Sequence, residues 1–519
     1  MVYRLGVDVG GTNTDAVILD DNLKLIENVK VPTTEDVTTG IFEAIHAVLE
    51  KSKIEKNDIK YAMLGTTQCT NAIVERKKLN QVGIIRLGSP ATHSIEPMAD
   101  WPEDLRNVVS ENFFIVKGGF EFDGRELTPF DETEIRDVVN KMKGKVEAVA
   151  ISCVFSPVRS DHEKMAADII KEELGDIPIS MSHEVASMGL LERENATILN
   201  SALMKVAETV TEGFKEGLKK EGVNRAEVFL CQNDGTLMNV EYTKKFPILT
   251  VACGPTNSIR GASFLSLKKN AIVLDVGGTT TDIGVIVNAF PRESSLATDV
   301  GGARTNFRMP DIIAIGLGGG TIIRTENEAI KVGPDSVGYQ LTQKALVFGG
   351  DTLTASDIAV RLGMADIGNP SLVEHIPEEF AKSTMDIMME KIEEGIDKMK
   401  LSSEAVPVVL VGGGGVIVKD NLKGVSELIK PESFPVANAI GSAIAQVSGT
   451  FEKLFALDAI TRDEALKTAK KEAVATAIRG GADPNKVEVV EVEDVPLAYH
   501  PGNATRIKVK AAGDLAINQ

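Results

Sequence analysis

The sequence predicts an α/β protein of two lobes, built on mixed and largely parallel sheets. An octapeptide, DVGGTNTD at Asp8–Asp15, recurs as DVGGTTTD at Asp275–Asp282, and the two copies match at seven of eight positions. Around these copies strand patterns alternate with helical patterns, as in α/β folds. A chain of 519 residues also exceeds the size at which one hydrophobic core keeps growing. The repeat therefore predicts a duplicated domain, with one octapeptide in each lobe.

The predicted elements of the first half follow this alternation, and the first three strands form an antiparallel meander. Short apolar or alternating runs predict strands at 3–9, 15–19, 24–31, 60–65, 81–86 and 147–153. Helical spacing of apolar residues predicts helices at about 37–51, 69–77, 160–174 and 186–221. Residues 88–130 contain four prolines and a Gly-Gly pair, and we interpret them as an inserted loop region or a lid.

The second half repeats the alternation and ends in an appendage. Besides the second octapeptide hairpin, which starts at 271, strands are predicted at 226–232, 247–251, 407–411, 486–493 and 505–512. Helices are predicted at 355–363, 377–399, 435–449 and 461–480. We therefore expect a first lobe over 1–185, a second lobe over 186–450, and a small C-terminal α+β appendage over 451–519.

Composition argues against several classes of function. The formal net charge is −19, from 56 basic and 75 acidic side chains, and no basic cluster stands out, which argues against nucleic acid or an anionic membrane as partner. No apolar run approaches the ~20 residues of a membrane span, and the N-terminus lacks the features of a signal peptide. The four cysteines form no CxxC pair, so neither zinc nor a disulfide framework is expected. These features predict a cytoplasmic protein with buried, reduced thiols.

Each octapeptide lies between two short apolar runs, which predicts strand, tight Gly-Gly turn, strand. The tip of such a hairpin exposes backbone N–H groups and hydroxyls, and a nest of amides can hold a phosphate. The candidate phosphate-binding residues are Gly10, Gly11, Thr12, Asn13 and Thr14 in the first copy, and Gly277, Gly278, Thr279, Thr280 and Thr281 in the second. One copy alone fits an ordinary glycine-rich turn equally well, whereas two copies favour one nucleotide gripped from both sides of a cleft.

An aspartate precedes each turn and another follows it. Asp8 and Asp275 end their strands, where a carboxylate beside bound phosphates would hold Mg²⁺, usually through waters. They are the candidate catalytic and metal-binding residues. Asp15 and Asp282 lie one step into the returning strands, on a side that the sequence does not assign. We expect them to fix the hairpins through hydrogen bonds to turn amides.

Two further glycine-rich stretches follow the second hairpin. The strand at 408–411 leads into Gly412, Gly413, Gly414 and Gly415 and then into a helix with small residues, which suits the close approach of an adenine and a ribose. Alone, the same pattern fits any tight β-to-α turn. The GLGGGT stretch at 316–321 lacks the spacing of a dinucleotide site, and we expect it to border the cleft.

Motifs of several other kinds of catalysis are absent from the sequence. The six histidines form neither HxH nor HExxH, and there is no GxSxG elbow and no GxxxxGK[ST] loop. His183, within SHEV, is the most notable histidine, although a lone histidine is more often structural. A phosphate-binding site is therefore the chemistry that the sequence favours.

Hairpin, hairpin and glycine strand, in that order, resemble the phosphate-1, phosphate-2 and adenosine segments of the actin and sugar-kinase superfamily. Within it the chain is similar to the hydantoinase/oxoprolinase family over nearly its whole length. The segments that carry this resemblance are LGVDVGGTNTDAVIL (5–19), GTTQCTNAIVERK (65–77), SHEVASMGLLERENATILNSAL (182–203), QNDGTLM (232–238), CGPTNSIRGA (253–262), LDVGGTTTDIGVI (274–286), PDIIAIGLGGGTI (310–322) and RIKVKAAGDL (506–515).

The resemblance implies a two-lobed actin/sugar-kinase-like ATPase fold and ATP-dependent cleavage of cyclic amides such as hydantoins and 5-oxoproline. Its shared chemistry is phosphoryl transfer from Mg-ATP to a lactam or hydantoin carbonyl. The two hairpins would cradle phosphates, Asp8 and Asp275 would hold Mg²⁺, and Gly412–Gly415 would border adenosine. The positions that match a family segment near the substrate are Thr66, Thr67, Asn71 and Arg76. A separate large hydrolase subunit is the partner that the resemblance implies, and a homo-oligomer is left open.

Three departures from the family pattern leave substrate and partner open. The family's usual SGPAGG is CGPTNS at 253–258, its GGAGP adenosine segment with a histidine is GGGGVIV at 412–418, and the C-terminal part is short. The ATP-using subunit of a ketone carboxylase is therefore one alternative. A nucleotide-dependent activator or regulatory ATPase, which does no chemistry on a small molecule, is another.

Overall fold

The structure is a computed structural model of the chain. It describes residues 2–10, 13–33, 37–186, 188–294, 298–307, 309–327, 329–458, 460–497 and 504–516. Gly11 and Thr12, at the tip of the first predicted hairpin, lie outside the described residues. Within the described part no helix is long and apolar enough to cross a membrane, and the four cysteines are buried and unpaired.

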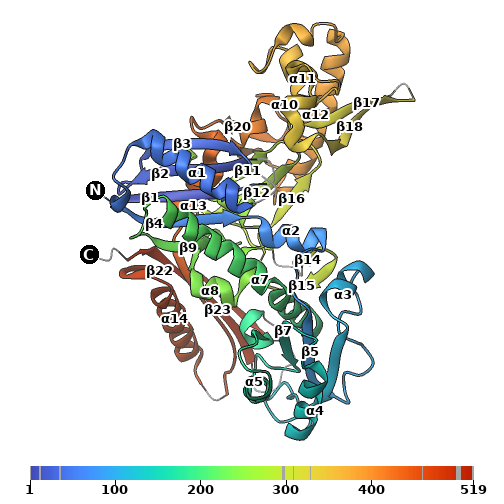
Figure 1. The fold of residues 1–519 in the computed structure, drawn as a ribbon, viewed down its shortest axis with the longest axis vertical. Helices are drawn as coiled ribbons and strands as arrows, with labels where there is room; N and C mark the ends of the chain where they lie inside the picture. The colour runs from blue at the N-terminus through green and yellow to red at the C-terminus, as the bar shows by residue number, and fades with distance from the viewer. Residues whose placement is uncertain are drawn as a thin grey trace.

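The first lobe is built on a nine-stranded sheet in the order β22-β23-β21-β10-β9-β4-β1-β2-β3 (Figure 1). Its N-terminal strands are β1 (Tyr3–Val9), β2 (Asn13–Asp20), β3 (Leu25–Pro32), β4 (Ile59–Thr66), β9 (Glu227–Cys231) and β10 (Leu237–Asn239). The antiparallel meander predicted for the first three strands is confirmed. Strands β4 and β9 run parallel to β1, so their carboxyl ends meet at one edge of the sheet.

Helices cover both faces of this sheet, which explains why its central strands are almost continuously apolar. Leu5, Val7 and Val9 of β1 pack in one core with α1 (Val37–Ser52) and α7 (Leu190–Lys220). On the other face α13 (Ala437–Ile444) packs against β1 and β2. Because side chains alternate along a strand, Gly6 and Asp8 lie on the α13 side.

The second lobe repeats this topology. Its main sheet has the order β13-β12-β11-β19-β20, with β16 added beside β12. When β16 is set aside, this order matches β3-β2-β1-β4-β9 of the first lobe, strand for strand along the chain. The strands are β11 (Ala271–Val276), β12 (Thr281–Val287), β13 (Phe290–Pro291), β16 (Ile312–Ile315), β19 (Val406–Val411) and β20 (Val425–Ile429). Helices α9 (Cys253–Ser266) and α12 (Glu378–Met399) contribute to the two cores on either side of it. The predicted duplication is confirmed.

A second α/β unit is inserted in the first lobe, with its own parallel sheet in the order β6-β5-β7-β8. Its elements are α2 (Gln68–Glu75), β5 (Val82–Ser89), α3 (Glu103–Val109), β6 (Asn112–Lys117), α4 (Glu132–Met142), β7 (Ala148–Cys153), α5 (Asp161–Leu174), β8 (Ile179–Met181) and α6 (Ser182–Val185). The prediction of an irregular stretch at 88–130 was wrong for α3 and β6. The apolar run FFIV of β6 is short and lies between proline- and glycine-rich segments, which hid it.

The C-terminal α+β segment is not a free-standing sheet, because its strands extend the first-lobe sheet. These elements are β21 (Val447–Ala456), α14 (Arg462–Arg479), β22 (Ala482–Pro496) and β23 (Ala504–Leu515). Strand β21 pairs with β10 and with β23. The predicted helix at 435–449 ends at Ile444, and the predicted strand at 247–251 is a short 3-10 helix that begins at Pro247.

Of the remaining helices and strands, α8 (Val240–Lys245) packs on β9, β10 and α7 of the first lobe, and the others belong to the second lobe or to its contacts with the first. The others are β14 (Thr298–Val300), β15 (Ala303–Thr305), β17 (Thr321–Glu326), β18 (Ala329–Ser336), α10 (Leu341–Lys344) and α11 (Ala355–Arg361). Strands β17 and β18 form a hairpin that projects from the second lobe (Figure 1).

Candidate functional site

The two octapeptides fold into hairpins of the same register. Gly10 N–H donates to the Asn13 carbonyl at 3.0 Å, and Gly277 N–H donates to the Thr280 carbonyl at 2.9 Å. Both loops therefore contain two residues, which are Gly278 and Thr279 in the second copy. In each hairpin the aspartates before and after the turn are direct cross-strand partners. Since directly opposed residues share a face of the sheet, Asp8 and Asp15 point to the same side.

The predicted phosphate-binding residues divide into exposed and internal ones. Thr279 and Thr280 are exposed at the tip of the second hairpin. Thr281 is fully buried, and its hydroxyl donates to the Leu317 carbonyl at 2.6 Å. Thr14 is buried as well and its hydroxyl lies 3.3 Å from that of Thr33. The hydroxyls of Thr14 and Thr281 therefore make internal hydrogen bonds, and only the backbone groups of these two residues remain to bind a phosphate.

The GLGGGT stretch supports the second hairpin from behind. Gly319 and Gly320 N–H donate to the carbonyls of Gly277 and Gly278 at 3.0 and 2.7 Å. A Cβ on Gly318 would lie 2.7 Å from backbone atoms of the hairpin, so the close approach requires glycine there. The stretch borders the hairpin and orients its carbonyls away from the tip.

Asp8 is held by two amides that come from different helices. Asn257 of α9 donates to one oxygen at 2.8 Å, and Asn438 of α13 donates to the other at 3.0 Å. Asn438 also donates to Asp15 at 2.9 Å, and Asp15 forms an ion pair with Lys30. Among the described residues, the partners of Asp15 are side chains of β3 and α13, while the turn amides of Gly11 and Thr12 lie outside the described residues. Asp282 makes no hydrogen bond within the described residues.

The acidic side chains around Asp8 raise one another's proton affinity. Burial raises the pKa of Asp8 to about 7, and the nearby charges of Asp15 and Asp275 add to this, while the two asparagine amides oppose it. Burial likewise raises the pKa of Asp275, against a hydrogen bond from Ser258 and the charge of Lys30. Against the effect of burial, Lys30 lowers the pKa of Asp15 and of Asp275, whereas no ammonium group of the described residues offsets Asp8, and a site of this kind attracts a cation.

A magnesium ion fits this donor set when a nucleotide supplies further ligands. Among the described residues, no group of three or more His, Cys, Asp or Glu side chains is placed to hold a metal ion. Mg²⁺ commonly takes one or two carboxylates and completes its shell with waters and phosphate oxygens. Asp275 is partly exposed, and each oxygen of Asp8 keeps a second lone pair beside its asparagine contact.

The four glycines after β19 have different surroundings. A Cβ on Gly412 would lie 2.3 Å from an Asp275 oxygen, and one on Gly414 would lie 2.3 Å from the Gly277 carbonyl. A Cβ on Gly415 would meet Leu410 and Phe434 at 3.3–3.4 Å, whereas Gly413 borders open space. The first and third glycines let this turn pack on the second hairpin. Gly413 is the position that leaves room for a ligand.

The four predicted substrate residues lie on and after β4, next to the first hairpin. Thr66 is buried, while Thr67 is partly exposed and donates to the Val9 carbonyl at 3.3 Å. Asn71 donates to the Thr67 hydroxyl at 3.4 Å. Arg76 instead donates to the Gly301 carbonyl at 2.8 Å and pairs with Asp104 at 3.0 Å. Its guanidinium therefore contacts the second lobe at Gly301, and Arg76 would have to give up its contacts with Gly301 and Asp104 to bind a substrate.

Sequence reasoning missed the residues that contact the aspartates of the hairpins: Asn257 and Asn438 on Asp8, Lys30 on Asp15, and Ser258 on Asp275. A signal for two of them was present, because Asn257 and Ser258 are the last two letters of CGPTNS, where the family pattern has two glycines. The amide of Asn257 reaches Asp8 and the hydroxyl of Ser258 reaches Asp275. This departure therefore lies directly at the two candidate metal-binding aspartates.

Family comparisons agree with this geometry. Residues 4–174 match the model of the hydantoinase/oxoprolinase N-terminal region, and residues 193–366 match the hydantoinase/oxoprolinase model. The chain belongs to the hydantoinase/oxoprolinase family. The resemblance inferred from its motifs is thereby confirmed.

Several relatives have named activities. The chain is 26% identical to the acetophenone carboxylase gamma subunit of Aromatoleum aromaticum, over 70% of this chain and 53% of the relative. It is 25% identical to the caprolactamase subunit alpha of Pseudomonas jessenii, over 70% and 54%. An uncharacterized protein of Methanocaldococcus jannaschii is 27% identical over 77% and 62%. The chain thus spans between about half and two thirds of the length of these relatives.

Two solved structures share the fold. The ATP-dependent caprolactamase from Pseudomonas jessenii superposes with a TM-score of 0.77, at 18% identity, and covers 99% of this chain and 88% of that one. A nucleotide-free structure of acetone carboxylase superposes with a TM-score of 0.71, at the same identity and coverages. Together with the duplicated sheet order, these matches confirm the predicted fold class.

Proposed function

We propose that this chain is the nucleotide-using part of an ATP-dependent enzyme that activates the carbonyl of a cyclic amide by phosphoryl transfer. The observation that carries the proposal is the pair of hairpins with the same register, in which Asp275 lies close enough to Asp8 for its charge to raise the pKa of Asp8. Two hairpins of one register that face each other suit a polyphosphate, which has anionic groups to offer to both.

The chain's own groups would divide the work of phosphoryl transfer. Exposed backbone and hydroxyl groups at Thr279 and Thr280 would hold phosphate oxygens, and Gly413 would leave room for the nucleoside. Asp8 and Asp275 would hold Mg²⁺, which neutralises charge on the phosphates when it is bound. Positioning and charge neutralisation are what this reaction needs most from a protein. The acceptor would be a lactam or hydantoin oxygen, since its phosphorylation removes the resonance that protects the amide.

The named relatives support an amide substrate. One is called caprolactamase subunit alpha, and a 5-oxoprolinase of Saccharomyces cerevisiae is 24% identical over 69% of this chain and 31% of that protein. We further propose a separate subunit as partner, because two of the relatives are themselves called subunits. Buried reduced thiols and the acidic surface fit a cytoplasmic location.

A ketone carboxylase subunit is the second candidate. It is favoured by the match to the acetophenone carboxylase gamma subunit and by the fold shared with acetone carboxylase. Both candidates use ATP to place a phosphoryl group on a carbonyl oxygen. They differ in the acceptor, which is an amide in one case and a ketone in the other.

The test is ATP turnover by the purified chain, alone and with its natural partner subunit, against a panel of hydantoins, lactams and imides. Stimulation by one of these compounds supports the amide substrate. Turnover that needs ketone and bicarbonate, and that no amide stimulates, would select the carboxylase. Slow turnover that responds only to a protein partner would reject both and favour a regulatory ATPase.

A further inference from the structure

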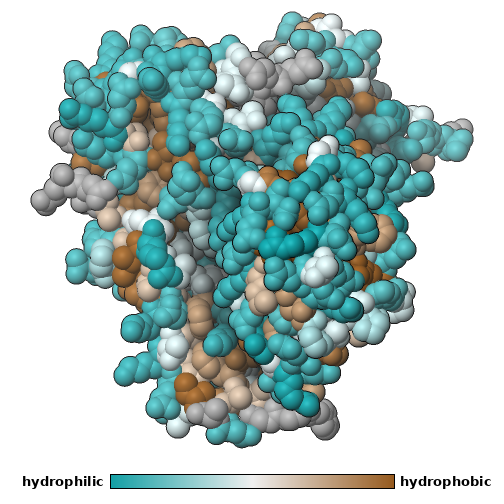
Figure 2. Space-filling view, turned by 60° about the horizontal axis from the view of Figure 1, so that its bottom comes forward, coloured by the Kyte–Doolittle hydropathy of each residue, from teal (hydrophilic) through white to brown (hydrophobic). Residues whose placement is uncertain are grey.

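A large cavity lies beside the hairpins and is not used by the site described so far. It has a volume of about 1240 Å³ and is walled by α6, the β9–β10 turn, β13 and the C-terminal strands β21, β22 and β23. The molecular surface is hollowed on the face shown in Figure 2. Pockets for small molecules commonly measure about 300–1,000 Å³, so this cavity has room for a substrate and for side-chain movement.

One wall of the cavity carries a histidine oriented by a buried carboxylate. His183 Nδ1 lies 2.5 Å from an oxygen of Glu163, and its own backbone N–H donates to the same oxygen at 3.1 Å. Glu163 is fully buried, whereas 16% of the His183 side chain is exposed. Ser182 donates to the second Glu163 oxygen at 2.5 Å and accepts from Arg193 at 2.9 Å.

The direction of these hydrogen bonds determines the state of the imidazole. Glu163 accepts from Ser182 and from the His183 backbone, and Arg193 supplies a positive charge behind Ser182, so the carboxylate acts as an acceptor only. His183 Nδ1 then donates to Glu163, and in the neutral imidazole this places the lone pair on Nε2. Nε2 makes no hydrogen bond with any described residue. A histidine oriented in this way by a carboxylate is suited to act as a general base.

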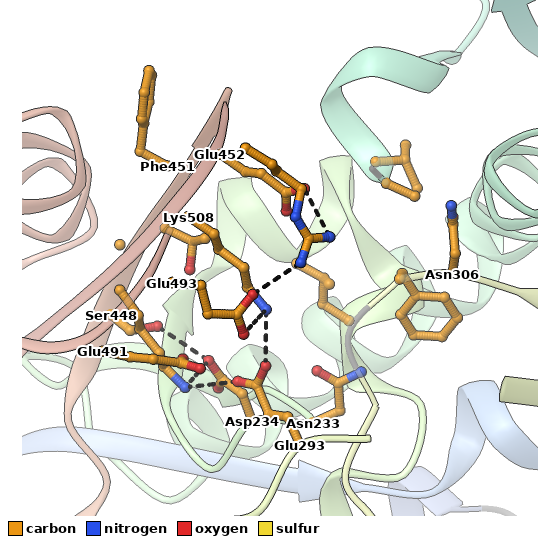
Figure 3. A pocket seen from close by; sticks show the side chains of 18 of the residues that line it. Asn233, Asp234, Glu293, Asn306, Ser448, Phe451, Glu452, Glu491, Glu493 and Lys508 are labelled. Carbon is orange, nitrogen blue, oxygen red and sulfur yellow. Dashed lines mark hydrogen bonds and ion pairs between the residues drawn. The ribbon is translucent and has the colours of Figure 1, made fainter. Parts of the chain in front are cut away.

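The opposite wall is strongly polar. Arg506, Lys508 and Lys510 alternate along β23 and line the cavity. Figure 3 shows Lys508 among carboxylates that come from several elements, including Asp234 and Glu293. Lys510 pairs with Asp234 at 2.8 Å, and Lys508 lies 3.4 Å from Glu293. The charges of these lysines are neutralised by the ion pairs within the wall. The cavity is therefore polar and suits an uncharged polar molecule such as a cyclic amide.

The cavity begins close to the phosphate hairpins. Strands β1, β4 and β9 are adjacent and parallel, and the cavity wall starts at Gln232, directly after β9. Neighbouring strands are about 4.8 Å apart, so the end of β9 lies about 10 Å from the first hairpin along the sheet edge. A substrate in the cavity can therefore present its carbonyl toward a nucleotide held at the hairpins.

Phosphoryl transfer to an amide oxygen needs a proton acceptor. The γ-phosphorus forms a bond to the carbonyl oxygen and loses its bond to ADP, while the amide nitrogen gives up its proton and its N–H electron pair becomes the C=N bond of an imidate phosphate. A ketone would lose a Cα proton in the same way and become an enol phosphate. Both candidate substrates thus require a base next to the carbonyl.

We propose that this cavity binds the substrate and that His183 Nε2, positioned by Glu163, takes the proton released when the carbonyl oxygen is phosphorylated. This inference rests on the proposed function and assigns its substrate pocket and its base. His183 touches the substrate in this scheme and is a catalytic residue, while Glu163 is a positioning residue.

The experiment compares wild type with His183→Ala and His183→Gln, using the compound that stimulates wild-type ATP turnover most. We expect turnover to fall 10²–10⁴-fold, the scale of a lost general base, with unchanged binding of an ATP analogue. Imidazole added to the His183→Ala protein should restore part of the turnover, because the cavity has room for it. His93→Gln changes an exposed histidine that bonds Ser89, and this control should keep full turnover.

Four outcomes decide the matter. Full turnover by His183→Ala would overturn the assignment of the base. The assignment would also fail if the variant lost both turnover and nucleotide binding and imidazole did not restore the turnover. Glu163→Gln gives an independent reading, since it should lower kcat more than it raises KM if it acts through His183. If no amide or ketone stimulates even the wild-type protein, the proposed function itself fails.

Discussion

Helices α9 and α13 cross with their backbones in contact, and Gly441→Ala tests how much the site depends on this crossing. A Cβ on Gly441 would lie 1.8 Å from the Asn257 carbonyl oxygen, and one on Gly261 would lie 1.9 Å from the Ala437 carbonyl oxygen. Helix α13 also packs on β1 of the first lobe, whereas α9 packs on β11, β12 and β19 of the second. The crossing therefore joins the two lobes and carries both asparagines that hold Asp8.

The size of the effect follows from the contact. Real Cβ atoms essentially never approach within 3.0 Å of another heavy atom, so the two backbones must separate by more than about 1 Å. Overpacking of this kind costs about 1–3 kcal/mol, and the upper end applies because the obstacle is backbone. Replacement of a helical glycine by alanine stabilises the helix itself by about 1 kcal/mol, because alanine has the higher helix propensity. We expect a net loss of about 2 kcal/mol in the free energy of unfolding.

Urea unfolding followed by circular dichroism measures this loss, and Gly217→Ala is the matched control. Gly217 also lies in a helix, α7, but its added Cβ would meet only the end of Ile45 at 3.6 Å, an ordinary contact. That variant should therefore be more stable than wild type by about 0.5–1 kcal/mol. A Gly441→Ala protein as stable as wild type, with unchanged affinity for an ATP analogue, would refute the reasoning.

Three further predictions concern the aspartates. Asp8→Asn should lower Mg-ATP binding or turnover by about 10²–10⁴-fold, and unchanged ATP turnover would reject the assignment of the first hairpin. Burial, aided by the charge of Asp275, raises the pKa of Asp282 to about 7, so the folded state binds this proton more tightly and stability falls as pH rises from about 4 to 7. Because the side chain is partly exposed, we expect Asp282→Asn to raise the free energy of unfolding by about 1–2 kcal/mol at pH 8 and to leave it unchanged near pH 4. Thermal unfolding at both pH values measures this difference. Asp357 accepts two backbone hydrogen bonds at 2.7 Å and one from the Thr354 hydroxyl at 2.8 Å, so Asp357→Ala should cost about 3 kcal/mol in urea unfolding and Asp357→Asn clearly less.

The hairpins could be predicted from sequence because everything that forms them is local. Apolar strands flank two glycines and two small polar residues, and this pattern alone determines the turn and the register that follows from it. The same locality explains why the helices α1, α5, α7, α12 and α14 were found close to their observed bounds. Where a helical pattern ran into a strand pattern, the boundary was wrong: the predicted helix at 435–449 continued past Val447, at which β21 begins.

The partners of Asp8 could not be predicted, because they depend on which helices the fold brings over β1. Asn257 and Asn438 lie 249 and 430 positions from Asp8 along the chain, and the whole second sheet lies between them. Arg76 shows the same limit, since its position in a family segment did not reveal that Gly301 and Asp104 take its guanidinium. Side chains that meet across lobes are a property of packing, which one sequence does not display.

The two hairpins are alike in backbone and unlike in charge, and this difference bears on how a nucleotide is held. In the first copy the protein itself compensates the carboxylates, with Lys30 on Asp15 and an amide on each oxygen of Asp8. In the second copy Asp275 has only a serine hydroxyl and a distant lysine, and the pKa of Asp282 is raised by burial and by the charge of Asp275. A buried carboxylate without a matching cation is costly, and a metal ion that arrives with the phosphates would remove that cost. We therefore propose that the second hairpin, more than the first, depends on a bound cation for its stability.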